Sequence, residues 1–146
     1  LYYPDSIYTV KETYTDLISP GMPFTMDLTD YLLNEDYVFL MTIRDINTVN
    51  EGSIEDFKEL LVGSREKGIP FFVLSPAGTE DVQNFKDKYD FDATFLGIDG
   101  VEVKIIVRSN PGLVLLNKGT VLDKWPSRSI EDFEDIYEEY INIKTD

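Results

Sequence analysis

Two continuous apolar runs, separated by a segment of helical periodicity, mark the first half of the chain. Residues 37–43 (YVFLMTI) and 71–75 (FFVLS) are rich in strand-forming residue types, which predicts strands buried on both faces. Between them, apolar residues recur at helical spacing. Ser53 is the expected N-cap, with Asp56 completing an approximate capping box, and Gly68 is the expected stop. This order predicts a right-handed parallel βαβ unit.

Downstream of these elements the pattern predicts a second helix and a short strand. The helix begins at Thr79, because the acidic residues that follow suit its positive end. The strand spans residues 93–96. Residues 101–107 (VEVKIIV) are ambiguous, since their β-branched side chains favour a strand, whereas acidic residues at cap spacing favour a helix from Gly100. We expect a helix there.

The chain closes with a predicted hairpin and a helix. Residues 112–116 and 120–125 are strand-like and flank a turn signal that contains Gly119. The last helix is predicted from Ser129, and its outer face is strongly acidic. The complete order, β-α-β-α-β-α-β-β-α, predicts an α/β fold whose mixed sheet has helices on both faces.

The first part of the chain follows none of these periodicities. Residues 1–24 contain prolines and a glycine that break any long element, so we expect an irregular N-terminal arm, or tether, before a domain over residues 25–146. No apolar run is long enough to span a membrane. The chain begins with Leu1 rather than Met, from which we expect that an upstream segment has been removed.

Composition narrows the possible chemistry. The 146 residues include 19 aromatic ones (9 Phe, 9 Tyr and 1 Trp), enough to form a core. Cysteine and histidine are absent, which excludes thiol chemistry, Ser-His catalysis and histidine metal sites within this chain. The net charge of −15 disfavours nucleic acid as a partner. We therefore expect no cofactor, no metal and, on balance, no enzyme.

A proline directly before the predicted hairpin carries a resemblance. Pro111 resembles the cis-proline of the thioredoxin fold, so we expect a cis Asn110–Pro111 bond, since only X-Pro bonds adopt cis geometry at small cost. The stretches MDLTDYLLNEDYVFLM and IIVRSNPGLVLLNKGTVLDKW are similar to the C-terminal thioredoxin-like domain of bacterial DoxX-family membrane proteins. The likeness covers residues 25–128, and RSNPGL is its most specific part.

The resemblance implies a thioredoxin-like three-layer sandwich with a mixed sheet. It also implies a domain that follows a hydrophobic membrane region and lies on the extracytoplasmic (periplasmic) side. In redox-active thioredoxins two cysteines stand after the first buried strand, at the start of the next helix. Here residues 44–53 occupy that place without a cysteine. We therefore expect a non-catalytic interaction or regulatory module whose partners are a protein or peptide and its own upstream membrane region.

Two loops are the candidate site. In the thioredoxin fold the loop after the first buried strand lies beside the loop before the cis-proline, so these residues are expected to face one another across a shallow groove. The groove would bind a peptide or a carboxylate, with arginine as bidentate donor. Alternatively, an arginine–aspartate pair merely holds the two loops together. The candidate residues are Arg44, Asp45, Asn47, Arg108, Asn110 and Pro111.

Two further hypotheses stay open beside this one. An enzyme of unknown type could use carboxylate, lysine or serine groups, and it would need a deep pocket with a pKa-shifted acid or lysine. A loose acidic cluster also occurs at Asp87, Asp90, Asp92 and Asp99, but it lacks the ligand spacing of a calcium loop. Turn and cap roles are the preferred interpretation of these four residues.

Overall fold

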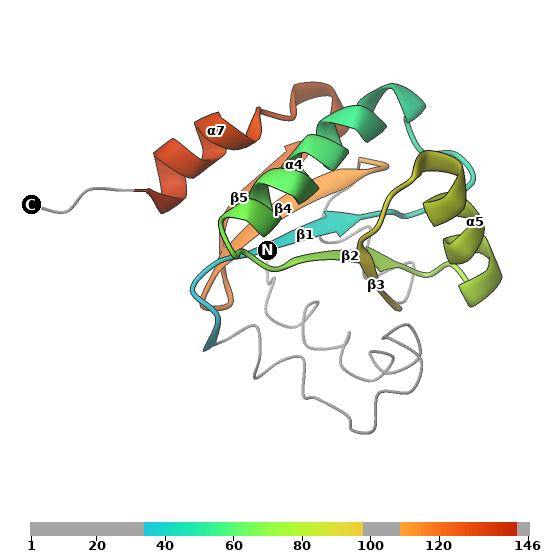
Figure 1. The fold of residues 1–146 in the computed structure, drawn as a ribbon, viewed down its shortest axis with the longest axis horizontal. Coiled ribbons are helices and arrows are strands. Elements are labelled where there is room, and N and C mark those ends of the chain that lie inside the picture. Colours follow the sequence, from blue (N-terminus) through green and yellow to red (C-terminus); the bar gives the residue numbers. More distant parts are fainter. Residues whose placement is uncertain (1–33, 98–108, 143–146) are drawn as a thin grey trace, which may run out of the picture.

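The computed structural model describes residues 34–97 and 109–142 and centres on a five-stranded sheet of order β3-β2-β1-β4-β5 (Figure 1). β1, β2 and β3 run parallel, whereas β4 pairs antiparallel with both β1 and β5. The mixed sheet is therefore as predicted. The strands are β1 (Val38–Thr42), β2 (Phe71–Ser75), β3 (Thr94–Gly97), β4 (Gly112–Asn117) and β5 (Thr120–Pro126).

In the part of the chain that the structure describes, three helices pack against one face of this sheet. They are α4 (Ile54–Glu66), α5 (Thr79–Tyr89) and α7 (Phe133–Ile136), which continues into the π-helical turn η4 (Tyr137–Ile141). All three helices contribute to one apolar cluster, and α4 and α7 lie side by side over the strands (Figure 1). The helix expected over residues 101–107 and the arm expected over 1–24 lie outside the described residues. No helix of the described part is long and apolar enough to cross a membrane.

The continuous apolar runs correspond to strands that are buried on both faces. Phe39 and Met41 of β1 belong to the cluster beneath the helices, whereas Val38 and Leu40, which alternate with them, are just as buried on the opposite face. All five residues of β1 are buried. A strand that is buried on both faces favours a continuous apolar run, whereas a strand with one exposed face alternates apolar and polar residues. This difference explains why these strands could be predicted.

The start of the first helix differs from the prediction. Ser53 ends a short 3-10 turn, η2 (Glu51–Ser53), and its side chain makes no capping bond to α4. The capping side chain is Asn50, whose Oδ1 accepts a hydrogen bond from Gly52 N at 3.1 Å. Ser53 Oγ instead donates to the Asn50 carbonyl at 2.8 Å. The helical segment therefore begins earlier than expected, because asparagine caps the turn that leads into it.

The last helix begins later than predicted, at Phe133 rather than Ser129. Residues Ser127–Ser129 form a separate 3-10 turn, η3, and Ile130 is extended. The Trp125 indole donates a hydrogen bond to Glu131 Oε2 at 2.7 Å, which ties this extended stretch to the end of β5. A side-chain bond across the chain thus overrides the local helical pattern.

Two backbone features agree with the sequence-based expectations. The Asn110–Pro111 peptide bond is cis. In the hairpin turn between β4 and β5, Lys118 and Gly119 both have positive φ, at 48° and 83°. Positive φ at both central residues is typical of a type I′ turn, whose twist matches that of the flanking strands.

Candidate functional site

The candidate site lies where β1 ends and β4 begins. Thr42 of β1 pairs in register with Gly112 of β4. The residues that follow Thr42 and the residues that precede Gly112 therefore leave the sheet side by side, at the same end of the strands. We call these segments, residues 43–50 and 109–111, the loop pair. The expectation that they lie side by side is met in the described part of both loops.

The side chain of Asn110 connects the two loops directly. Its Oδ1 accepts a hydrogen bond from Asp45 N at 3.3 Å, and its Nδ2 donates to the Asp45 carbonyl at 2.8 Å. The same Nδ2 also donates to Thr48 Oγ1 at 3.2 Å. One amide side chain therefore satisfies three polar groups of the opposite loop, a role for which its paired donor and acceptor are suited.

Backbone and hydroxyl contacts extend this connection. Asn50 N donates to the Asn110 carbonyl at 3.0 Å. Ser109 Oγ donates to the Pro111 carbonyl at 2.7 Å and accepts from Ser127 N at 2.9 Å. These bonds join the loop pair to the turn after β5. Three separate segments of the sequence, residues 43–50, residues 109–111 and the turn at Ser127, are consequently joined by hydrogen bonds at this site.

The other predicted residues lie at different depths. Pro111 is buried, Arg44 is half-buried, and Asn47 is exposed. Asp45 Oδ1 accepts a hydrogen bond from Asn47 N at 3.0 Å, which closes a turn within the loop. Among the described residues, no carboxylate lies within ion-pair distance of Arg44, so an Arg44–aspartate pair does not hold the loops together in this part of the chain. Arg108 lies outside the described residues.

A pocket of about 180 Å³ opens beside the loop pair, on the side of α5. Glu51 connects its two walls, because Tyr89 Oη donates to Glu51 Oε1 at 2.9 Å and Lys88 Nζ lies 3.8 Å from the same oxygen. The bond to Tyr89 and the charge of Glu51 raise the pKa of Lys88 above its ordinary value. The pocket is lined by Ile46, Asn47, Val49, Glu51, Asp81, Asn84, Phe85, Lys88 and Tyr89.

Sequence reasoning found only Asn47 among the residues that line this pocket. Neither Tyr89 nor Glu51 is among the residues that the sequence singles out. The two residues are 38 positions apart, and their contact depends on how α5 packs. A tyrosine at the end of a predicted helix is the only local signal, and it does not identify a partner.

The start of α4 is the place where the resemblance puts redox cysteines. Asn50 and Ser53 stand at the two ends of the 3-10 turn that leads into α4, and both side chains are used in hydrogen bonds within the loop, as described above. Neither side chain can form a disulfide. This arrangement supports a rigid surface without thiol chemistry at this position.

An enzymatic site would need ionisable side chains that are buried or have shifted pKa values, and residues 34–97 and 109–142 bear on this requirement. All buried polar side chains there are hydroxyls: Thr42, Ser53, Ser64, Ser75 and Ser127. Apart from Lys88, the other clearly shifted pKa belongs to Tyr140, which is partly exposed. Within the same residues no group of three acidic side chains could hold a metal ion. Of the loose acidic cluster, Asp99 lies outside the described residues.

Comparison of the structure with solved structures identifies the fold. The chain is similar to a secreted Mycobacterium tuberculosis disulfide oxidoreductase homologous to E. coli DsbE, with 16% identity, a TM-score of 0.54 and coverage of 76% of this chain and 83% of that one. The fold is thioredoxin-like. The sequence itself matches no protein-family model and no curated protein.

Two further solved structures agree with this fold. The thioredoxin domain of a Bacteroides vulgatus thiol-disulfide oxidoreductase has 14% identity and a TM-score of 0.54, and the match covers 75% of this chain and 82% of that one. A thiol:disulfide interchange protein DsbE from Chlorobium tepidum has 16% identity and a TM-score of 0.54, with coverage of 73% and 77%. At these identities the similarity shows the fold alone. The present chain contains no cysteine, so it lacks the residue type on which disulfide exchange depends.

Proposed function

We propose that this chain is a thioredoxin-like binding module that recruits a protein or peptide partner through the loop pair and performs no thiol redox chemistry. The observation that carries the proposal is the set of bonds made by Asn110. These bonds hold two separate loops together before any partner arrives. A surface that is already ordered loses less conformational freedom on binding, which favours affinity.

Two side chains of the loop pair supply recognition chemistry. Arg44 is half-buried and has no carboxylate partner among the described residues, so its guanidinium is suited to a bidentate contact with a carboxylate of the partner. Asn47 is exposed and lines the adjoining pocket, where its amide can donate and accept. An extended segment that carries a carboxylate fits this pair of groups.

Selection of peptides from a random displayed library tests the proposal. We expect selected peptides to shift the amide resonances of residues 43–50 and 109–111. The double variant Arg44→Ala, Asn47→Ala should weaken their binding about tenfold, equivalent to about 1.4 kcal/mol. Arg65→Ala, at the other end of α4, is the matched control and should change the affinity less than twofold. Peptides that bind the double variant as tightly as the wild type would contradict the proposal.

A thiol-dependent assay tests the second half of the proposal. With dithiothreitol present, the purified domain should not accelerate insulin reduction or peroxide consumption above the background rate, because no thiolate is available to attack. Its melting temperature should not change when the reductant is added. Any thiol-dependent turnover that follows the concentration of the pure domain would show that another group performs the chemistry.

We also propose that hydrophobic helices upstream of this domain anchor it on the extracytoplasmic face of a membrane. The support is the similarity of residues 25–128 to the C-terminal domain of DoxX-family membrane proteins. In cells that make the native full-length protein, protease added to spheroplasts should release the domain. Complete protection until the membrane is permeabilised would place the domain on the cytoplasmic side.

A further inference from the structure

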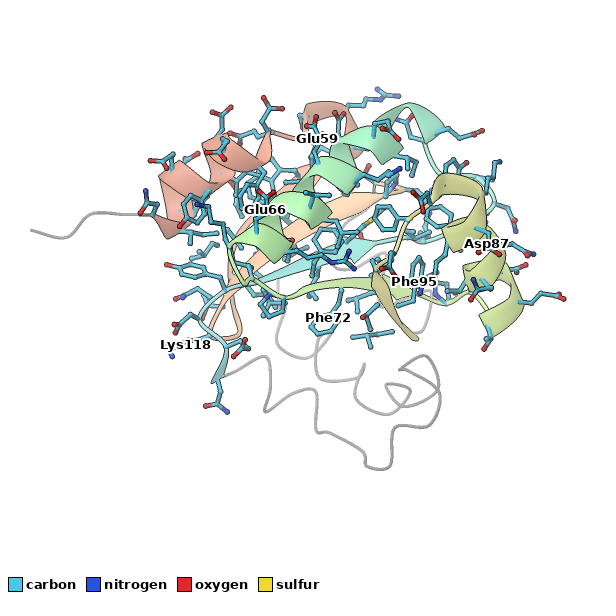
Figure 2. All side chains as sticks on the ribbon, viewed as in Figure 1. Glu59, Glu66, Phe72, Asp87, Phe95 and Lys118 are labelled. Atoms are coloured by element: carbon cyan, nitrogen blue, oxygen red, sulfur yellow. The ribbon has the colours of Figure 1, made fainter. Side chains whose placement is uncertain are left out.

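A second surface, distinct from the loop pair, lies between α4 and α7. The two helices border a groove of about 500 Å³ that shares no residue with the loop pair. Glu59 and Glu66, both on α4, belong to its wall (Figure 2). Asp132 and Glu134, which flank Phe133 at the start of α7, also line the groove. We call this surface the α4–α7 groove.

The groove has an exposed apolar side chain among its acids. Val62 is 53% exposed, and Leu122 is the other large apolar residue exposed to a comparable extent in the described part of the chain. Glu55, Glu59, Val62 and Glu66 are spaced at four, three and four residues, so they form one stripe along α4. The helix thus presents a single apolar contact point within a line of carboxylates.

Close contact of the two helices defines the groove. The ring of Phe133 lies against Gly63, where a Cβ atom would come within 2.5 Å of the ring. Phe133 is only 7% exposed and belongs to the main apolar cluster. The start of α7 is therefore fixed against α4, and the acids on both helices keep a defined spacing.

The charges of the groove are largely uncompensated. Five carboxylates line it, and its only cation is Lys58, which lies 3.8 Å from Glu55. Among the described residues, no lysine or arginine lies within ion-pair distance of the other four acids. Like charges in a partly enclosed groove repel one another, and a cationic ligand relieves this repulsion.

We propose that the α4–α7 groove docks a short basic segment of a partner protein, whose lysine and arginine side chains pair with the acids while one apolar side chain covers Val62. This inference goes beyond the proposed function, because it concerns a different surface and a partner of opposite charge. The sign of the groove favours a basic segment over an anionic membrane or nucleic acid. A net charge of −15 disfavours a second copy of this chain as the occupant.

Fluorescence anisotropy with synthetic peptides tests the proposal. The probe is a labelled peptide of lysine and arginine around a central leucine, and its twin carries glutamate at every basic position. The basic peptide should bind the wild-type chain, and its affinity should fall as the salt concentration rises. The glutamate twin should not bind. Equal binding of the twin would overturn the proposal.

Paired variants separate the groove from general charge and apolarity. Glu59→Lys should weaken binding of the basic peptide at least tenfold, whereas Glu80→Lys, the same change on α5, should weaken it less than twofold. Val62→Ser should weaken binding about fivefold, whereas Leu122→Ser on β5 should leave it unchanged. An equal loss in both members of either pair would overturn the proposal.

Two outcomes distinguish this inference from its alternatives. The loop variant Arg44→Ala, Asn47→Ala should bind the basic peptide like the wild type, so failure of the loop proposal leaves this one intact. If that variant loses the basic peptide as fully as Glu59→Lys does, the groove is not the docking site. If the wild-type chain sediments as a dimer and Val62→Ser sediments as a monomer, the occupant of the groove is a second copy of the chain. That result would overturn the proposal.

Discussion

The loop pair and the α4–α7 groove differ in how their polar groups are satisfied. In the loop pair, Asn110, Asp45 and Ser109 form hydrogen bonds within the pair or to the turn after β5. In the groove, most carboxylates have no cationic partner among the described residues. The first surface is held together by its own hydrogen bonds, whereas the second is held by apolar packing beneath it and retains unneutralised charge. We therefore expect the loop pair to recognise its partner by shape and the α4–α7 groove to recognise its partner by charge.

Removal of the groove's apolar support should have the largest effect. Phe133→Ala deletes a nearly buried ring that packs against Phe39 and stacks on Tyr137. We expect a loss of about 3–5 kcal/mol in the free energy of unfolding, measured by urea denaturation, together with loss of basic-peptide binding. Leu122→Ala, an exposed control, should stay within about 0.5 kcal/mol. A loss below about 1 kcal/mol for Phe133→Ala would show that α7 contributes little to the core.

A smaller loss is expected at the point where the two helices touch. Gly63→Ala gains about 1 kcal/mol of helix propensity but brings a methyl group against the Phe133 ring. Overpacking typically costs about 1–3 kcal/mol, so after that gain we expect a net loss of up to about 2 kcal/mol in urea denaturation. Val62→Ala, the adjacent exposed position, controls for helix propensity. If Gly63→Ala is more stable than the wild type, α7 can move away without cost.

The loop pair should respond more weakly to truncation. Asn110→Ala removes three side-chain hydrogen bonds, but water can reach the groups that are released, so we expect a loss of about 1–1.5 kcal/mol. Amide exchange at Asp45 should accelerate, and basic-peptide binding should not change. Asn84→Ala, exposed on α5, is the control. Unchanged exchange at Asp45 would contradict the role of Asn110 as the connection between the loops.

The smallest effect concerns η4, the turn that follows α7 and lies outside both surfaces. Tyr140 of η4 donates a hydrogen bond to Asp123 Oδ2 on β5 at 2.5 Å, and this bond raises the pKa of the tyrosine above its ordinary value near 10. The folded state therefore holds this proton more tightly than the unfolded state does. Its stabilising contribution is complete below about pH 10 and is lost as pH rises above that value.

Tyr140→Phe should remove this pH dependence. We expect a loss of about 0.5–1 kcal/mol at neutral pH, because one partly exposed hydrogen bond disappears. Urea denaturation between pH 8 and 11 should then show a shallower decline for the variant than for the wild type. Tyr137→Phe, on the same turn, should follow the wild-type profile. Parallel profiles of Tyr140→Phe and the wild type would show that the bond to Asp123 is not formed in solution.

Much of the fold could be predicted because its signals are local. The strand pattern of residues 37–43 and 71–75 and the turn at Gly119 follow from adjacent residue types, and the structure confirms all three. The last helix shows where such signals fail. Ser129 looks like an N-cap, but it ends the 3-10 turn η3 and is followed by the extended Ile130, in a segment that the bond between Trp125 and Glu131 closes. A contact across the turn therefore decided that boundary.

The candidate site was predictable in position but not in detail. The resemblance placed the two loops side by side, and the register of Thr42 with Gly112 accounts for their proximity. It did not indicate that Asn110, rather than Arg44, joins them. Which side chain makes the connection depends on the depth and direction that each residue acquires when the strands pair, and no spacing along the chain contains that information.

The sequence by itself determined the order of elements in the described part of the chain, the absence of thiol chemistry in this chain and the acidic stripe along α4, because these depend on residue type and local period. Only the tertiary structure brought Phe133 against Gly63 and thereby formed the α4–α7 groove. It also joined Glu51 to Tyr89 across the pocket beside the loops. Such pairs unite segments 38 or more residues apart. Their contacts exist only once the core has fixed the relative positions of the helices.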